Sequence, residues 1–246
     1  MDDLRKFLKG YLWEEWKTLE TDQKKRIPSP PPQKPHPKEA QLIDLVPVLD
    51  IRVGNLPTRD AIMRRKSRRQ YSGEALTIEE LSYLVWATQG IKRIIREGNT
   101  ITRTVPSAGS RHPFETYLFV GSVENLTEGL YRYLGLEHKL CFLYAQDSLR
   151  ERVHAACYDQ YVMESSVVFI WTAIPYRTVW RYGELAPKLI AQDSGHLCQN
   201  LYLACESIGV GVCAIGAYHQ EEMDAILGVD GEEEFTVYLA TVGRNA

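Results

Sequence analysis

The sequence lacks a long apolar run and any cluster of cysteines, and these absences exclude several classes of protein. No stretch approaches the ~18 apolar residues that cross a membrane as a helix. The first residues, Met-Asp-Asp-Leu-Arg-Lys, show no signal-peptide pattern. The five cysteines, at positions 141, 157, 198, 205 and 213, form no Cys-x-x-Cys pair and no Cys/His pattern with zinc spacing. We therefore expect a cytoplasmic protein with reduced, mostly buried thiols.

A large excess of one charge is also missing, as are two common motifs. The 246 residues carry a net charge of -3, so neither nucleic acid nor an anionic membrane is an expected partner. No Gly-x-Gly-x-x-Gly or Gly-x-Ser-x-Gly pattern occurs, which argues against a Rossmann domain and an α/β-hydrolase. Asp193 and His196 lie three residues apart, but a metal site needs three or more convergent ligands. We expect no metal and interpret this pair as polar residues at a subunit interface.

Prolines are concentrated in residues 28–37, where they exclude a helix or an inner strand. This stretch predicts an extended, polyproline-like arm or linker across the surface, with a partner-docking role as the alternative. Before it, apolar residues recur at nearly helical spacing over residues 4–19, which predicts an amphipathic helix. We therefore divide the chain into residues 1–57, an N-terminal helix and proline-rich arm, and residues 58–246, a folded domain.

Helical and strand-like segments alternate in the rest of the chain. The capping box Thr77-Ile78-Glu79-Glu80 opens a helix that Gly90 ends. Residues 166–174 form a continuous apolar run, typical of a central strand covered on both faces. Further helices are expected at 58–63, 148–156, 185–208 and 221–227, and further strands at 114–120, 130–134, 139–143, 210–214 and 235–242. The order contains no strict βαβ repeat, so we predict an α+β fold with a central mixed sheet.

Separated segments of the chain are suited to a phosphorylated, planar cofactor. In Arg65-Lys66-Ser67-Arg68-Arg69, alternate residues point to one side of an extended stretch, and guanidinium groups bind phosphate bidentately. Residues 106–110, Pro-Ser-Ala-Gly-Ser, have no bulky side chain, so their backbone can approach a ring. Residues 215–217 and the pair Gly243-Arg244 follow strand-like segments and could add N–H groups and one more guanidinium. Taken singly, the alternatives are a solvated basic patch and ordinary turns.

In this order and spacing, the segments resemble those of the nitroreductase family of FMN-dependent oxidoreductases. Residues 65–71 are similar to the family's Arg-x-Ser-x-Arg/Lys-x-aromatic motif, and residues 106–114 to its Pro-Ser-small-x-Asn/Ser segment with a following Pro-aromatic pair. Residues 209–217 and 242–244 look like its two C-terminal flavin segments. The resemblance covers about residues 58–246. It implies a mostly antiparallel mixed sheet flanked by helices, with FMN at the interface of an intertwined homodimer.

The resemblance also implies a role for each segment. The arginine-rich segment and Arg244 would hold the phosphate and ribityl chain. Gly216 would present its N–H near flavin N5, with Ile215 against the ring, and Gln160 would contact the pyrimidine edge. Residues 106–110 would come from the partner subunit. The implied cofactor-binding residues are Arg65, Lys66, Ser67, Arg69, Pro106, Ser107, Ala108, Gly109, Ser110, Gln160, Ile215, Gly216, Ala217, Gly243 and Arg244.

Within the family, the chain is most similar to the SagB-type, azoline-oxidising dehydrogenases. The proline-rich lead-in and residues 105–113, 129–133 and 193–200 carry that likeness. Where azoline-oxidising relatives have a Lys-Tyr pair implicated in taking a substrate proton, this chain has Arg181-Tyr182. Arginine stays protonated and cannot replace a lysine base. Arg181 would instead pin an anionic substrate or orient Tyr182.

We therefore expect an FMN-dependent oxidoreductase that passes a hydride through flavin N5, with NAD(P)H as a transient co-substrate and nitro or quinone compounds as acceptors. One alternative is a SagB-type dehydrogenase that oxidises azoline heterocycles in a peptide. An alternative of another class is a flavin-binding module without turnover. Arg181 and Tyr182 are the candidate catalytic residues. Together with Tyr176 and Trp180, Tyr182 forms an aromatic cluster suited either to a substrate lid or to packing.

Overall fold

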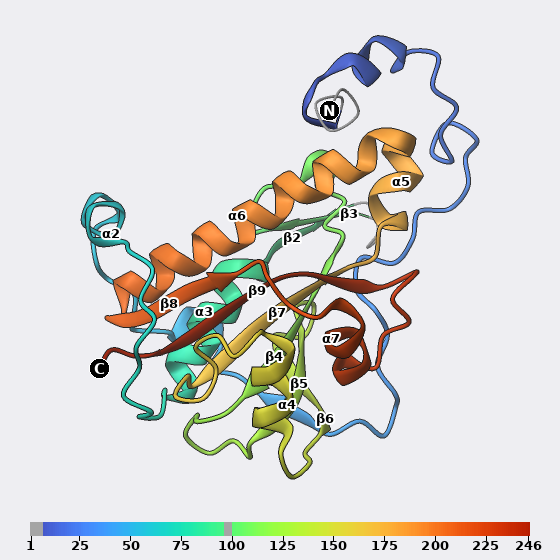
Figure 1. Cartoon of the computed structure of the whole chain (residues 1–246). Helices are drawn as coiled ribbons and strands as arrows, with labels where there is room; N and C mark the ends of the chain where they lie inside the picture. Colours follow the sequence, from blue (N-terminus) through green and yellow to red (C-terminus); the bar gives the residue numbers. More distant parts are fainter. Residues whose placement is uncertain (1–6, 96–99) are drawn as a thin grey trace.

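A seven-stranded sheet forms the centre of the fold, in the strand order β1-β6-β5-β4-β7-β9-β8 (Figure 1). The computed structural model describes residues 7–95 and 100–246. The strands are β1 (Leu42–Asp44), β4 (Phe114–Val120), β5 (Gly129–Leu134), β6 (Lys139–Tyr144), β7 (Val167–Ala173), β8 (Val210–Ile215) and β9 (Phe235–Arg244). All pairings between these strands are antiparallel, and an isolated parallel bridge joins Leu76 to Val123. The predicted α+β fold with a mostly antiparallel mixed sheet is confirmed.

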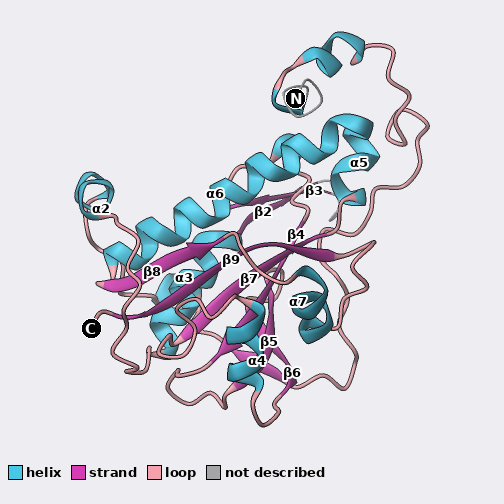
Figure 2. Cartoon of the chain, viewed as in Figure 1, coloured by secondary structure: helices cyan, strands magenta, loops and turns pink. Residues whose placement is uncertain are grey.

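Helices cover both faces of this sheet (Figure 2). On one face lie α3 (Ile78–Gln89) and α6 (Ala186–Ser207), and on the other lie α4 (Leu149–Ala156) and α7 (Gln220–Leu227). Two further helices are short, α2 (Thr58–Arg64) and α5 (Tyr176–Tyr182). Single 3-10 turns are η1 (Tyr11–Glu15), η2 (Val48–Asp50), η3 (Ala108–Ser110) and η4 (Gly183–Leu185). Each face of the sheet therefore has its own apolar layer.

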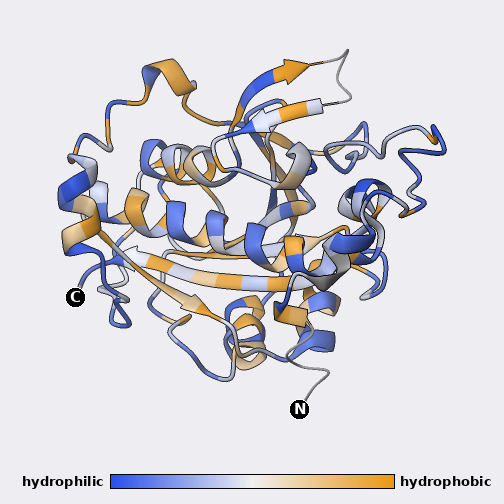
Figure 3. Cartoon of the chain, turned by 90° about the horizontal axis from the view of Figure 1, so that it is seen from above, coloured by the Kyte–Doolittle hydropathy of each residue, from blue (hydrophilic) through white to orange (hydrophobic). Residues whose placement is uncertain are grey.

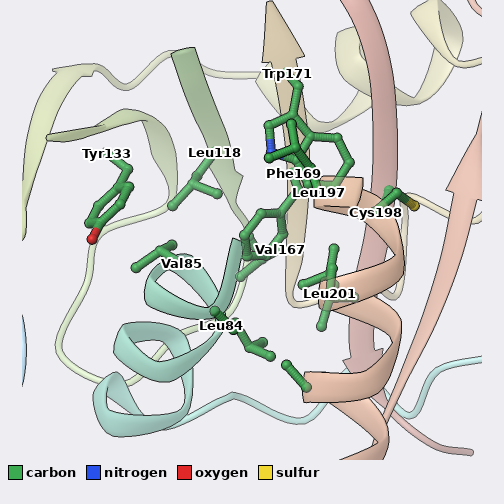
Figure 4. Close-up of a cluster of buried hydrophobic side chains, with 14 of the residues drawn as sticks. Leu84, Val85, Leu118, Tyr133, Val167, Phe169, Trp171, Leu197, Cys198 and Leu201 are labelled. Atoms are coloured by element: carbon green, nitrogen blue, oxygen red, sulfur yellow. The ribbon is translucent and has the colours of Figure 1, made fainter. Parts of the chain in front are cut away.

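The larger apolar layer lies between the sheet and α3 and α6. Figure 4 shows Leu84 of α3 and Leu201 of α6 near Phe169 of β7, and Figure 3 shows apolar colour along the inner strands. Each of the seven residues of β7 is buried, and β7 pairs with β4 on one side and β9 on the other. The predicted central strand is therefore confirmed. Fully burying one such apolar side chain contributes about 1.5–3 kcal/mol.

Local sequence signals account for several helix boundaries. The Thr77 hydroxyl accepts a hydrogen bond from the Glu80 N–H at 3.2 Å, and the Glu80 carboxylate accepts one from the Thr77 N–H at 2.8 Å. This is the predicted capping box, and Gly90 follows the last residue of α3 as predicted. The structure adds elements that the sequence did not predict: β1, α5, and a separate hairpin of β2 (Ile91–Ile95) and β3 (Thr100–Arg103).

The N-terminal segment differs from its prediction. A continuous helix was expected over residues 4–19, of which residues 4–6 lie outside the described part of the chain. From residue 11, the chain instead forms the short 3-10 turn η1, preceded by Gly10 at φ -97°. Glycine costs a helix interior about 1 kcal/mol. The aromatic side chains Trp13 and Trp16 pack against Tyr182 of α5, so tertiary contacts override the helical period.

The proline-rich arm crosses the sheet face that carries α4 and α7, at the end where Glu115 of β4 lies. The Lys34 N–H donates to the Glu115 carboxylate at 2.7 Å, and the Lys34 ammonium lies 2.5 Å from the Glu234 carboxylate. The carbonyls of Pro32 and Pro35 accept hydrogen bonds from Arg103 and Arg132. An extended proline-rich chain makes no internal hydrogen bonds, so its carbonyls are free for such donors. The arm is thus fastened to buried charged residues of the domain.

Two expectations about membranes and thiols can be compared with the fold. Among the described residues, no helix is both long enough and apolar enough to cross a membrane. All five cysteines are free and buried, as predicted. Burial raises the pKa of Cys157 and of Cys198 to about 12, so these two thiols stay protonated at neutral pH.

Candidate functional site

The arginine-rich segment runs extended beside the edge strand β8. The Arg68 N–H donates to the Val212 carbonyl at 3.0 Å. The Arg68 guanidinium turns to one side, where it forms an ion pair with Glu206 of α6 at 2.6 Å. Arg65 and Ser67 both contact a different residue of α6, Tyr202. The predicted extended stretch is present, and its contacts with α6 are made at Tyr202 and Glu206, one helical turn apart.

Tyr202 joins this segment to the end of β8. Its hydroxyl lies 2.8 Å from the Ser67 hydroxyl and accepts a hydrogen bond from the Ala214 N–H at 3.0 Å. The Arg65 guanidinium carbon lies 5.3 Å from the centre of the Tyr202 ring. No sequence pattern indicates this role, because Tyr202 falls on the buried stripe of a helix. Tyr202 therefore fixes Arg65 and Ser67 next to the loop that follows β8.

The last part of the arginine-rich segment lines an open hollow of about 510 Å³, together with the C-terminal residues Asn245 and Ala246. Within the described residues, Arg65, Lys66 and Arg69 form no ion pair, whereas Arg68 does. The Arg69 guanidinium carbon lies 5.8 Å from the ring centre of Tyr161. Of these three cations, Lys66 and Arg69 line the hollow, and cationic side chains without carboxylate partners are a donor set suited to a dianionic phosphate.

The loop after β8 is open to a ligand. Ile215 is buried, whereas Gly216 and Ala217 are exposed. A Cβ atom built on Gly216 would meet no described atom within 4 Å. The Gln160 side-chain amide donates to the Ala217 carbonyl at 3.0 Å and to the Cys157 carbonyl at 2.8 Å. Gln160 and residues 215–217, assigned to the same ligand from the sequence, are therefore neighbours.

Residues 106–110 lie elsewhere, against Arg181 and Tyr182. Gly109 has a φ of 55°, and a Cβ atom there would lie 2.6 Å from the Tyr182 hydroxyl oxygen and 2.9 Å from Arg181 Cδ. Only glycine therefore fits this turn without displacing the two side chains. The Ala108 N–H donates to the buried carboxylate of Asp193 on α6 at 3.3 Å. Burial raises the pKa of Asp193, and its hydrogen bonds from Ser107 and Ala108 oppose that shift.

The Tyr182 ring is largely buried, but its hydroxyl has no hydrogen-bond partner among the residues described. The ring is 8% exposed and lies between Trp13, Trp16 and the Arg181 side chain. The Arg181 guanidinium carbon is 5.4 Å from the ring centre. Of the predicted aromatic cluster, Trp180 is buried and Tyr176 is exposed. Tyr182 thus presents a fixed hydroxyl at the Gly109 turn.

Within one chain, the arginine-rich segment is not brought together with residues 106–110 and their neighbours Arg181 and Tyr182. Tyr202 and Asp193 anchor the two groups on the same helix, nine residues apart. At 1.5 Å per residue, this separates them by about 13.5 Å along α6. Gly243 and Arg244, at the end of β9, belong to neither group. Gly243 packs against Tyr71, and the Arg244 guanidinium forms an ion pair with Glu80 at 2.8 Å.

Asp193 and His196, interpreted from the sequence as interface residues, are 3.7 Å apart between a carboxylate oxygen and a ring nitrogen. No group of three or more residues able to hold a metal ion occurs in the part of the chain that the structure describes. Asp193 instead holds the backbone of the Gly109 turn. This gives it a structural role in the second group of residues.

His112, next to this turn, makes the stability of the fold depend on pH. Burial lowers the pKa of His112 to about 3, and the guanidinium groups of Arg103, Arg111 and Arg177 also lower it. In the unfolded chain the His112 ring takes up a proton near pH 6.5, whereas in the folded chain it stays neutral at that pH. His112 is therefore expected to reduce stability by about 1.4 kcal/mol for each pH unit below 6.5. Urea unfolding at pH 7.5 and pH 5 should show this loss in the wild type and a smaller one in His112→Gln. Equal losses in both proteins would contradict the assignment.

Comparison with known proteins places this arrangement in a family. The sequence pattern of the nitroreductase family matches residues 62–244. A Methanocaldococcus jannaschii protein named as a nitroreductase is 30% identical over 192 residues, which are 78% of this chain and 93% of the relative. The trifolitoxin-processing protein of Rhizobium leguminosarum bv. trifolii is 28% identical over 157 residues, 60% of this chain. The match spans only 41% of that relative's length.

Solved structures give the same picture of the fold. A nitroreductase structure from Ralstonia eutropha aligns with a TM-score of 0.70 at 25% identity and covers 89% of this chain and 99% of its own. The E. coli microcin synthetase McbBCD complex contains a chain that aligns with a TM-score of 0.61 at 15% identity. That alignment covers 78% of this chain and 74% of the other.

Proposed function

The chain belongs to the nitroreductase family, and from this premise we propose that it is a homodimeric enzyme that reduces nitro and quinone compounds with NAD(P)H through bound FMN. Family membership makes the chain a flavin-dependent oxidoreductase. The proposal goes further on one observation: cationic side chains without carboxylate partners and the Ser67 hydroxyl follow the edge strand β8, and an exposed glycine loop comes directly after that strand. No metal is needed for this chemistry.

These residues fit the chemical parts of FMN. A dianionic phosphate needs guanidinium and ammonium donors, and Arg65, Lys66 and Arg69 have no carboxylate partner within the described chain. The Ser67 hydroxyl, held by Tyr202, can bond a polyol or a phosphate oxygen. The open space at Gly216 allows a flat ring to approach the backbone. We propose that Gln160 supports this loop from behind through its bond to the Ala217 carbonyl.

Arg244 is proposed as a weaker phosphate ligand. Its guanidinium lies 2.8 Å from the Glu80 carboxylate, so its charge is already partly balanced. Its backbone is nevertheless close to the arginine-rich segment, because the Ser72 N–H donates to the Arg244 carbonyl. Gly243 contributes by allowing Tyr71 to pack against β9.

A second copy of the chain would complete the site. The Gly109 turn is about 13.5 Å along α6 from the arginine-rich segment of its own chain. We propose that in the homodimer residues 106–110 of one subunit, with Arg181 and Tyr182 behind them, face the ring held by the other subunit. The redox chemistry would come from bound FMN, whose N5 exchanges a hydride with the nicotinamide or the acceptor. The unbonded Tyr182 hydroxyl would then donate a hydrogen bond to the acceptor, while Arg181 supplies a fixed positive charge.

The experiment that tests this function is anaerobic reduction of the purified flavoprotein by NADH or NADPH. Loss of the flavin absorbance is expected with at least one nucleotide, followed by its return when a nitroaromatic compound or a quinone is added. The wild type without nucleotide is the control for photoreduction. Flavin that neither nucleotide bleaches would contradict the proposed direction of hydride flow.

A second candidate is a SagB-type dehydrogenase that oxidises azolines in a peptide. It is favoured by the likeness to the trifolitoxin-processing protein and by the Tyr182 hydroxyl that is free at the Gly109 turn. Arg181, in place of lysine, cannot take the substrate proton, so this activity would depend on Tyr182. Flavin bleached by an azoline peptide but by neither nucleotide would favour this candidate over the first.

A further inference from the structure

The N-terminal segment, residues 7–27, lies near α5 and the start of α6 (Figure 1), where Lys188 of α6 donates to the Leu8 carbonyl. Trp13 and Trp16 contact the Tyr182 ring, with ring centres 6.1 Å and 5.4 Å away. The two tryptophan rings are 5.6 Å apart. Tyr182 in turn reaches the Gly109 turn with its hydroxyl. A contact chain therefore connects the N-terminal segment to the proposed substrate end of the site.

Specific hydrogen bonds hold this segment in place. The Gln23 N–H donates to the Trp180 carbonyl, and the Trp180 indole donates to the Ile27 carbonyl, both at 2.9 Å. The Tyr176 hydroxyl donates to Asp22 at 2.8 Å. After residue 27, the proline-rich arm is fastened by Lys34 to two buried carboxylates. The position of Trp16 is therefore set by anchors on both α5 and the sheet.

The tryptophans do not behave as core residues. Trp13 is 42% exposed and Trp16 is half-buried, whereas Tyr182 beneath them is 8% exposed. Tryptophans that served only to pack would bury most of their large apolar area. Here Trp13 and Trp16 leave part of their rings open next to Tyr182, whose hydroxyl reaches the Gly109 turn. The Lys24 ammonium lies 5.8 Å from the centre of the Trp16 ring and donates to the carbonyls of Trp16, Lys17 and Leu19.

We propose that the N-terminal segment is a wall of the substrate site, and that Trp16 determines how large an acceptor can stack beside the Tyr182 hydroxyl. This inference rests on the proposed function, since it concerns which acceptors reach the flavin ring. Removing the Trp16 ring would open space next to Tyr182 and favour fused-ring acceptors over single-ring ones. Changing one wall of an apolar pocket alters discrimination between substrates by about tenfold or more.

The test compares Trp16→Ala with the wild type in two measurements. The first is the ratio of kcat/KM for a three-ring anthraquinone sulfonate to that for para-benzoquinone, which should rise about tenfold. The second is hydrogen–deuterium exchange of residues 176–185, which should become faster even without cofactor. Trp16→Phe keeps an aromatic ring and should restore the wild-type ratio. Leu8→Ala is the matched control, because the Leu8 side chain lies in the same segment and is 72% exposed.

Each outcome supports or overturns the inference. A raised ratio with faster exchange, both absent in Leu8→Ala, supports it. Unchanged exchange shows that the segment does not cover α5 in solution and overturns it. Faster exchange with an unchanged ratio of kcat/KM values shows that the segment does not limit acceptor size. This result overturns the inference and leaves the proposed function intact. Absence of flavin and of turnover in the wild type overturns the proposed function, and this inference with it.

Discussion

Replacing Arg177 with methionine is expected to lower the free energy of unfolding by about 3–5 kcal/mol, the usual cost of leaving a buried charge unpaired. The Arg177 guanidinium lies 2.5 Å from the Glu115 carboxylate, and the two side chains are 4% and 3% exposed. Methionine fills similar space without the charge. Glu115 would keep its hydrogen bond from the Lys34 N–H but lose its ion-pair partner. Urea denaturation at neutral pH measures the change.

Lys139→Met is the matched control for this prediction. Lys139 pairs with Asp44 at 2.8 Å, but the side chains are 37% and 83% exposed. An exposed pair of this kind is worth about 0–1 kcal/mol. A similar loss in both variants would show that the pair between β4 and α5 is no more important than a surface pair.

Arg65→Ala is expected to weaken FMN binding by about 1.5–3 kcal/mol, or roughly 10- to 150-fold, because it removes a charge-assisted contact. Arg244→Ala should weaken it less, since Arg244 already pairs with Glu80. Fluorescence titration of the apoprotein with FMN measures both.

The matched control for the FMN titration is Arg68→Ala in the same segment. The Arg68 guanidinium lies beside the same hollow, but its charge is already balanced by the ion pair with Glu206 at 2.6 Å. FMN affinity should therefore stay close to that of the wild type. A loss in Arg68→Ala as large as that in Arg65→Ala would mean that the segment binds phosphate only through its total charge. The assignment of individual residues would then be wrong.

Much of the fold could be predicted because its signals are local. The capping box at Thr77, the apolar run of β7 and the stripe of α6 each determine one element within a short window. The extended form of the arginine-rich segment was also predicted. Ser67 and Arg68 nevertheless both contact α6, through Tyr202 and Glu206, which lie one turn apart, so these contacts do not separate the two sides of the segment.

The remaining features depend on contacts between distant parts of the chain. The N-terminal turn η1 replaces the expected helix because Trp13 and Trp16 pack on Tyr182, more than 160 residues away. Tyr202 has the spacing of a core residue, and its hydrogen bonds to Ser67 and Ala214 carry no sequence signal. The role of Lys34 depends on a buried glutamate in each of two later segments. Such contacts cannot be derived from periodicity or composition.

The flavin content of the purified protein tests the central claim most directly. The absorption spectrum of the protein after dialysis against FMN and removal of the free cofactor measures how much is retained. The account predicts a flavin spectrum with close to one FMN per chain in the wild type and in Arg68→Ala, and clearly less in Arg65→Ala. A colourless wild type, or equal retention in all three proteins, would contradict a flavin site beside the arginine-rich segment.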